Sequence, residues 1–307
     1  MMSFSIIFPG QGSQAIGMMG ELATRHSLVK DLFVEASDAL GVDLWAMTQQ
    51  GPIDLLSQTE NTQPALLTAG VAAWRVWCDL GGQHPAIMAG HSLGEYTALV
   101  AAGALSFADG VKLVRDRGRY MQEAVPAGEG GMAAIIGLDD EQVIKVCAEI
   151  AGEDVLQAVN FNAPGQVVIA GSIAAIERAA PAMKAAGAKR ALPLPVSIPA
   201  HSSLMSSASA RLAERLASTD VRVPNIPVLH NHNVQIAQDS DQVKANLVSQ
   251  LDSPVRWVET VVTMHQQGVD TFIESGPGKV LGGMVKRIIK GVNIACIDKP
   301  EAFNALI

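Results

Sequence analysis

Short apolar runs alternate along the chain with longer segments in which apolar residues recur at helical spacing. In residues 27–40, Leu28, Leu32 and Ala36 fall on one stripe, and Gly41 follows as a helix-ending residue. Pro64 is suited to the first turn of a second helix. The pattern predicts strands at 3–8, 86–89, 228–230, 271–274 and 293–297, and helices at 27–40, 63–79, 95–102, 106–125, 203–218, 254–266 and 279–290. Repeated strand–helix units predict an α/β fold with a mostly parallel sheet and helices on both faces.

The middle of the chain follows a different order. It predicts strands at 132–138, 155–161, 166–170 and 189–194, and helices at 140–151 and 172–186. Asp139 and Ser172 are suited to cap the two helices. The order β-α-β-β-α-β is typical of a ferredoxin-like domain. We therefore predict a small domain, residues 128–197, inserted into a large domain formed by residues 1–127 and 198–307, with a cleft between them.

Composition narrows the class of protein. Of the 307 residues, 49% are hydrophobic and 17% are charged, so a sizeable core can be buried. Binding to nucleic acid requires a positively charged surface, so the net charge of −8 argues against a nucleic-acid partner. We expect no membrane span and, from the first ten residues, no signal peptide. Cys78, Cys147 and Cys296 are few and scattered, which favours a cytoplasmic location. His230 and His232 lack a third metal ligand and are interpreted as a strand end.

The candidate nucleophile is Ser92, in the pentapeptide Gly90-His91-Ser92-Leu93-Gly94. An apolar run precedes this segment and an alanine-rich segment follows it, so a strand, a sharp turn and a helix are predicted in succession. That is the setting of a nucleophile elbow. Glycines permit the tight turn, and the free N–H groups at the start of a helix can stabilise negative charge.

A serine hydroxyl needs a base. Among the seven histidines, His201 is the best candidate, because it follows the exit of the predicted insertion and would face the cleft. From the residues alone, a helix cap or a solvent-exposed side chain is an equal alternative. His91 lies inside the pentapeptide, where its side chain is expected to point away from Ser92.

Five segments together resemble one family. They are Phe8-Pro9-Gly10-Gln11-Gly12-Ser13-Gln14, Gln63-Pro64-Ala65-Leu66, Gly90-His91-Ser92-Leu93-Gly94-Glu95, His201-Ser202-Ser203-Leu204-Met205 and Gly276-Pro277-Gly278-Lys279-Val280. In order and spacing they resemble the bacterial malonyl-CoA:acyl carrier protein transacylases of type II fatty acid synthesis, over essentially the whole chain. The resemblance implies an α/β-hydrolase-like large domain and a ferredoxin-like insertion.

The resemblance also implies a reaction and a set of roles. Ser92 takes the malonyl group from malonyl-CoA, with His201 as base, and passes it to the phosphopantetheine thiol of acyl carrier protein. The main-chain carbonyl of Gln250 orients His201. The backbone N–H groups of Leu93 and Gln11 form the oxyanion hole. No cofactor is implied.

Recognition of a malonyl carboxylate calls for a fixed cation, and arginine suits that task because its planar fork binds carboxylates through two hydrogen bonds. On a helical wheel, Arg115 and Arg117 both flank the apolar stripe of the 106–125 helix, whereas Arg119 points away from it. Spacing does not choose between the first two, and the resemblance selects Arg117. It also places Gln63 at the substrate cleft, although Gln63 is an ordinary residue for a helix start.

Two other functions compete with acyl transfer. One is a carboxylester or thioester hydrolase on the same scaffold, which the lack of an assignable Asp or Glu partner for His201 disfavours. The other is a catalytically silent docking subunit, which the presence of Ser92, His201 and Arg117 disfavours. For the acidic carrier protein, two basic clusters are candidate docking surfaces. They are Lys184, Lys189 and Arg190, and Lys286, Arg287 and Lys290.

Overall fold

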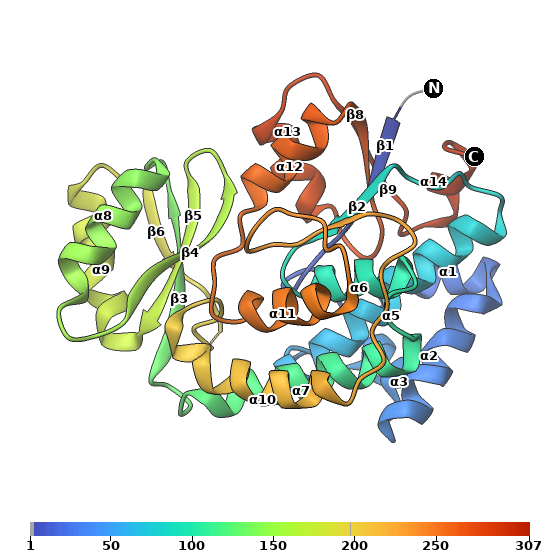
Figure 1. The fold of residues 1–307 in the computed structure, drawn as a ribbon, viewed down its shortest axis with the longest axis horizontal. Helices are drawn as coiled ribbons and strands as arrows, with labels where there is room; N and C mark the ends of the chain where they lie inside the picture. Colours follow the sequence, from blue (N-terminus) through green and yellow to red (C-terminus); the bar gives the residue numbers. More distant parts are fainter. Residues whose placement is uncertain (1–2, 197) are drawn as a thin grey trace.

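The computed structural model describes residues 3–196 and 198–307. Residues 1 and 2, and residue 197 at the end of the predicted insertion, lie outside the described residues. The chain folds as an α/β protein with a five-stranded sheet and a four-stranded sheet. The two sheets and their helices lie side by side along the longest axis of the molecule (Figure 1). Within the described residues, no helix is long and apolar enough to cross a membrane.

The larger sheet is parallel, with the strand order β7-β2-β1-β8-β9. Its strands are β1 (Ser3–Phe8), β2 (Ile87–Gly90), β7 (Val228–Leu229), β8 (Val269–Glu274) and β9 (Asn293–Cys296). Successive side chains of a strand point to opposite faces. In β1, Ile6 and Phe8 therefore pack into one hydrophobic core, and Ile7 packs into a second core behind the sheet.

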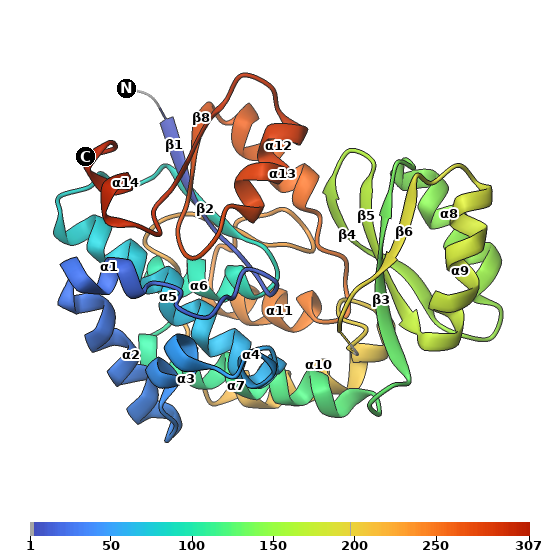
Figure 2. The ribbon, with the colours of Figure 1, turned by 180° about the vertical axis from the view of Figure 1, so that it is seen from behind.

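Helices cover both faces of this sheet, as the sequence predicts. On the Ile6 face lie α2 (Ser27–Leu40), α5 (Thr59–Asp79), α6 (Leu93–Ala101), α7 (Phe107–Ala124), α10 (Ser206–Ala217) and α11 (Ser240–Gln250). On the Ile7 face lie α12 (Trp257–Gln266) and α13 (Val280–Ile288). Shorter helices are α1 (Gly20–Arg25), α3 (Leu44–Gln50), α4 (Ile53–Leu56) and α14 (Pro300–Asn304). Figure 2 shows the same layers from behind.

The smaller sheet is antiparallel, with the strand order β4-β5-β3-β6. Its elements follow one another as β3 (Gly130–Ile136), α8 (Asp140–Ala151), β4 (Leu156–Ala163), β5 (Gln166–Ser172), α9 (Ile173–Ala185) and β6 (Arg190–Pro193). Ile135 and Ile169 pack beneath α8 and α9 on one face. Met132, Val168 and Ala170 line the other face, together with residues of the 194–200 segment that returns to the larger sheet.

Two predicted helices are corrected, and one helix at the site was not predicted. Helix α5 begins at Thr59, not at residue 63, so Pro64 lies inside it. Because proline has no N–H, the carbonyl of Glu60 lacks its usual hydrogen bond from residue 64, in the second turn of α5. The predicted 203–218 helix begins with a 3₁₀ turn, η1 (Ser203–Met205). Helix α11, which ends at Gln250, is absent from the prediction, because its apolar positions are few.

Candidate active site

The turn between β2 and α6 presents Ser92. Its backbone is left-handed, with φ 52° and ψ −111°, a conformation that is strained for a residue with a side chain. The flanking glycines are required by packing. A Cβ atom on Gly90 would overlap the main chain of Gly94, and one on Gly94 would overlap the carbonyl oxygen of Phe8. The turn therefore closes against the end of β1 only because both positions lack a side chain.

His201 lies next to Ser92. Its Nε2 is 2.7 Å from Ser92 Oγ, and its Nδ1 is 2.8 Å from the carbonyl oxygen of Gln250. Because a carbonyl only accepts, Nδ1 carries the proton and Nε2 is left to accept from the serine hydroxyl. The backbone of His201 is also left-handed, with φ 65°, and its N–H donates to the carbonyl of Leu251 at 3.0 Å. One hydrogen bond from the imidazole and one from the backbone N–H, both to the end of α11, thus hold His201 in place.

The surroundings of His201 keep its imidazole neutral. Its exposed fraction is 3%, and burial is the largest cause of a pKa lowered to about 3, with the neighbouring Arg117 guanidinium second. The hydrogen bond to the Gln250 carbonyl acts in the opposite direction but is weaker. A neutral Nε2 at physiological pH is what a general base requires.

Arg117 extends from α7 into the same site and is 1% exposed. Its guanidinium donates to Gln63 Oε1 and Gln250 Oε1, each at 2.9 Å, and to Ser92 Oγ at 3.3 Å. Burial lowers its pKa, and Tyr96, whose ring centroid lies 5.1 Å from Arg117 Cζ, is the largest opposing influence. Both amide acceptors are neutral, so the cation has capacity left for an anionic ligand.

Close packing of helices selects Arg117 over Arg115. A Cβ atom on Gly118 would lie 2.8 Å from the backbone of Thr59 and Glu60, so α7 approaches the start of α5 closely at this point. That approach brings Arg117 to Gln63. Arg115 instead donates to the carbonyl of Leu40 at 3.1 Å.

A cavity of about 130 Å³ opens over these groups. Ser92, His201, Arg117 and Gln63 lie at its polar side. Its apolar wall comes from α7, β3 and the segment that returns from the small sheet, and consists of Met121, Met132, Leu194, Val196, Ile198 and Ala200. Both sheets therefore contribute to the site.

The two candidate oxyanion donors reach the same cavity. Leu93 is the first residue of α6, and Gln11 is an exposed residue in the loop after β1. The cavity thus collects Ser92, His201, Arg117, Gln63, Gln11 and Leu93, all of which the sequence singles out. Gln250 lies behind it and contacts His201 and Arg117.

The contacts of several residues at the site were not predicted from the sequence. His91 Nε2 is 2.7 Å from Asn162 Oδ1 on β4, so the residue beside the nucleophile joins the large and small sheets. Glu95 and Asn231 are fully buried behind Ser92. Glu95 stands in the first turn of a helix, where an acid is ordinarily explained by the helix dipole, so its sequence position gave no sign of burial. Among the described residues there is no group of three or more His, Cys, Asp or Glu side chains that could hold a metal.

Comparison with known proteins identifies the relatives of this chain. The family model described as acyl transferase domain matches residues 5–296. The malonyl CoA-acyl carrier protein transacylase of Salmonella typhimurium is 54% identical over 307 residues, covering 100% of this chain and 99% of that protein. The crystal structure of an acyl carrier protein S-malonyltransferase from Vibrio cholerae superposes with a TM-score of 0.98 at 53% identity, covering 99% of this chain and 100% of that one.

A further neighbour is a malonyl-transacylase solved in complex with a type II PKS acyl-carrier protein. It has a TM-score of 0.98 at 51% identity and covers 99% of this chain and 98% of that one. Family match, identity and fold agree over nearly the whole chain, and the chain belongs to the acyl transferase domain family, among the malonyl CoA-acyl carrier protein transacylases.

Proposed function

We propose that this enzyme transfers a malonyl group from malonyl-CoA to the phosphopantetheine thiol of acyl carrier protein, through a malonyl ester on Ser92. The observation that carries the proposal is the contact of Ser92 Oγ with both a neutral base and a buried cation, His201 at 2.7 Å and Arg117 at 3.3 Å. The first pair supplies a nucleophile, and the cation suits an acyl group that ends in a carboxylate.

In the first half-reaction, His201 Nε2 takes the proton of the Ser92 hydroxyl as Oγ attacks the thioester carbonyl. The oxygen that becomes negative is held by the backbone N–H groups of Leu93 and Gln11. The C–S bond then breaks, and His201 returns its proton to the leaving sulfur. CoA departs as a thiol, and the malonyl group remains on Ser92.

The second half-reaction runs these steps in reverse, with the carrier-protein thiol in the place of CoA. The carrier-protein thiol gives its proton to His201, and its sulfur attacks the Ser92 ester. The C–O bond breaks, and Oγ recovers the proton. Because Nδ1–H donates to the carbonyl of Gln250 throughout, Nε2 accepts and returns the proton in both half-reactions.

Arg117 is the proposed anchor of the malonyl carboxylate. The oxygens of Gln63 and Gln250 hold the guanidinium toward the nucleophile, and Gln63 also lines the cavity. A carboxylate bound there fixes the acyl group with its carbonyl near Ser92. Hydrolysis is the alternative on this scaffold. The main-chain partner of His201, in place of a carboxylate, favours transfer over a hydrolase triad.

Intact-protein mass spectrometry tests the proposal directly. After mixing with malonyl-CoA, the enzyme is expected to gain the mass of one malonyl group, and addition of carrier protein in the phosphopantetheinylated form is expected to remove it. Ser92→Ala is the control and should gain nothing. A wild-type enzyme that releases malonate to water as fast as it consumes malonyl-CoA would contradict transfer and favour the hydrolase.

The carrier protein needs a positive surface on an enzyme whose net charge is −8. Arg287 on α13 donates to Gln166 at 2.7 Å, and Gln166 pairs across the small sheet with Ile136, which pairs in turn with Arg190. Arg287 and Arg190, one residue from each of the two basic clusters, therefore lie near the same end of the small sheet. We propose that this end receives the acidic carrier protein.

We also propose the finer divisions of the fold. The order of strands and helices in the small sheet supports a ferredoxin-like domain at 128–197, inserted into an α/β-hydrolase-like domain of residues 1–127 and 198–307. The three cysteines, all unpaired, support a cytoplasmic location.

A further inference from the structure

A buried carboxylate lies directly behind the nucleophile. Glu95 is 0% exposed and accepts three hydrogen bonds, from His230 Nδ1 at 2.7 Å, the backbone N–H of Asn231 at 2.8 Å and Gln250 Nε2 at 2.8 Å. These donors come from the segment after β7 and from the end of α11. Glu95 therefore ties both segments to the helix that begins beside Ser92.

Asn231, which Glu95 holds in place, forms hydrogen bonds to the turn of the nucleophile before and after His91. Its Oδ1 accepts from the backbone N–H of Ser92, and its Nδ2 donates to the carbonyl of Gly90, each at 2.7 Å. These two bonds fix the peptide planes on either side of His91. They act where the backbone is strained, at Ser92 with φ 52°.

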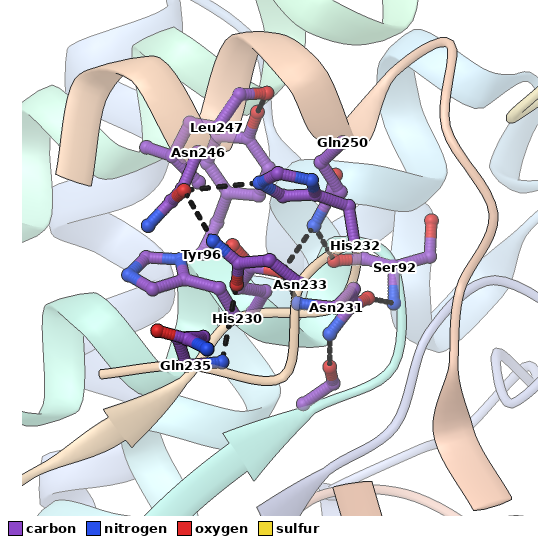
Figure 3. Close-up of polar contacts among 12 residues, drawn as sticks. Ser92, Tyr96, His230, Asn231, His232, Asn233, Gln235, Asn246, Leu247 and Gln250 are labelled. Atoms are coloured by element: carbon purple, nitrogen blue, oxygen red, sulfur yellow. Dashed lines mark hydrogen bonds and ion pairs between the residues drawn. The ribbon is translucent and has the colours of Figure 1, made fainter. Parts of the chain in front are cut away.

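Gln250, the second residue held by Glu95, fixes the next peptide plane. Its Nε2 donates to the carbonyl of Ser92 at 2.9 Å. In a planar trans peptide the C=O and the following N–H point in opposite directions. Holding the Ser92 carbonyl toward Gln250 therefore aims the Leu93 N–H away from it. As the first residue of α6, Leu93 has no acceptor within its own helix. Figure 3 shows Asn231 and Gln250 reaching Ser92 from different directions.

We propose that Asn231 and Glu95 are positioning residues for acyl transfer, which together hold three successive peptide planes so that Ser92 Oγ and the Leu93 N–H are both aimed at the substrate carbonyl. The inference rests on the proposed function for its substrate. Neither side chain touches the reacting atoms. Their effect is on geometry, and displacements of about 1 Å at a reacting centre cost about 100-fold in rate.

The test compares Asn231→Ala with Asn246→Ala. Asn246 lies in the same polar cluster, where its Oδ1 accepts from His232 Nε2 at 3.0 Å and Asn233 Nδ2 at 2.9 Å, but its side chain has no hydrogen bond to Ser92 or Gln250 (Figure 3). Each variant loses two hydrogen bonds. The single-turnover rate of Ser92 acylation by malonyl-CoA is measured beside the burst amplitude and the melting temperature.

Asn231→Ala is expected to slow acylation by about 100-fold, with the KM for malonyl-CoA changed by less than about threefold, because the Arg117 anchor remains. Its burst amplitude should stay near one malonyl group per folded molecule. The amplitude measures how much enzyme is folded, whereas the rate measures how well Ser92 and the oxyanion hole are positioned. Asn246→Ala should lower the melting temperature comparably and leave the rate within about threefold of wild type. A normal rate in Asn231→Ala, or equal losses in both variants, overturns the proposal.

Two further variants keep the test decisive if Asn231→Ala does not fold. Asn231→Asp has the same size and keeps the acceptor for Ser92 N–H, but faces the Gly90 carbonyl with an oxygen, so acylation is expected to slow by about tenfold. Glu95→Gln keeps the acceptor for Asn231 and Gln250, and its amide can donate to His230 if that imidazole carries its proton on Nε2. Glu95→Gln should therefore retain far more activity than Glu95→Leu. Normal acylation in folded Asn231→Asp, or equal activity of the two Glu95 variants, contradicts the inference.

Labelling of Ser92 by a fluorophosphonate separates this inference from the proposed function. The probe needs the nucleophile and the oxyanion hole but no malonyl group. Slower labelling of Asn231→Ala supports the positioning role even if malonyl-CoA were not the donor, whereas labelling at the wild-type rate overturns it.

Discussion

The neutral state of His201 makes a sharp prediction for the pH dependence of acylation. A histidine with the ordinary pKa of about 6.5 is neutral in about 3% of molecules at pH 5, so a rate that depends on it falls about 30-fold between pH 8 and pH 5. Burial and Arg117 lower the pKa of His201 to about 3. More than about 90% of His201 is then still neutral at pH 5, and we expect less than a twofold loss.

The assay is the burst of CoA thiol release at malonyl-CoA concentrations well below KM, because kcat/KM reports the ionisation of the free enzyme. An inflection near pH 6.5, with about a tenfold loss for each pH unit below it, would refute the argument from burial. The cause can be tested separately by following the His201 ring by NMR in Arg117→Gln. Removing the cation should raise the His201 pKa, because Arg117 is one of the two largest causes of its depression.

The same shift links pH to stability, with a definite sign. The pKa of His201 is lower in the folded state than in the unfolded chain, so the unfolded chain binds a proton first as the pH falls. The stabilisation is fully present above pH 6.5 and is lost as the pH falls from 6.5 toward about 3. His201 alone contributes a slope of about 1.4 kcal/mol per pH unit within that window, and urea unfolding of His201→Gln should show a flatter dependence.

Three further predictions concern the anchor, the partner surface and the turn. Arg117→Ala should lower kcat/KM for malonyl-CoA by at least about 100-fold, since two charge-assisted hydrogen bonds of about 1.5–3 kcal/mol each are lost, while acetyl transfer survives or rises; equal loss on both substrates removes the anchor role. Lys286→Glu with Arg287→Glu should raise KM for the carrier protein and leave acylation by malonyl-CoA unchanged; a matching fall in acylation would assign this surface to CoA or to folding. Gly94→Ala should destabilise the fold by about 3 kcal/mol in urea unfolding, because its Cβ overlaps the end of β1. Gly283→Ala, on an exposed helix position with open space around it, is the control and should be neutral or about 1 kcal/mol more stable.

Features of the fold that depend on neighbouring residues could be predicted from the sequence. Asp139 and Ser172 cap α8 and α9 as expected, each accepting from the backbone N–H three residues later. The strand before Ser92 and the helix after it are also confirmed. A local signal existed for α11 as well, because Asp239 caps it and Gln242 follows at capping-box spacing. Periodicity alone overlooked it.

Contacts between distant segments could not be predicted in this way. Asn231 meets Ser92 across 139 positions of the chain, and Gln250 meets Glu95 across 155. The residues next to Glu95 in the sequence do not show whether it is a buried acceptor of several hydrogen bonds or an exposed acid in the first turn of a helix. The choice between Arg115 and Arg117 likewise depends on where α7 meets α5, which is a property of packing and not of the helical wheel.

These distant contacts also bear on how the site discriminates between acyl groups. Arg117 is buried, and the acceptors that hold its guanidinium are the neutral oxygens of Gln63, Gln250 and Ser92. The cost of burying that charge is met by the fold before any substrate arrives, and burial accordingly lowers the pKa of the guanidinium. Glu95 acts on this cation only through space, without a hydrogen bond to it, whereas a malonyl carboxylate could bind it directly; an acetyl group has no charge to offer. We propose that selection for the diacid follows from a buried cation whose hydrogen-bond acceptors are all neutral, and that it does not require a pocket that excludes the smaller acyl group by size.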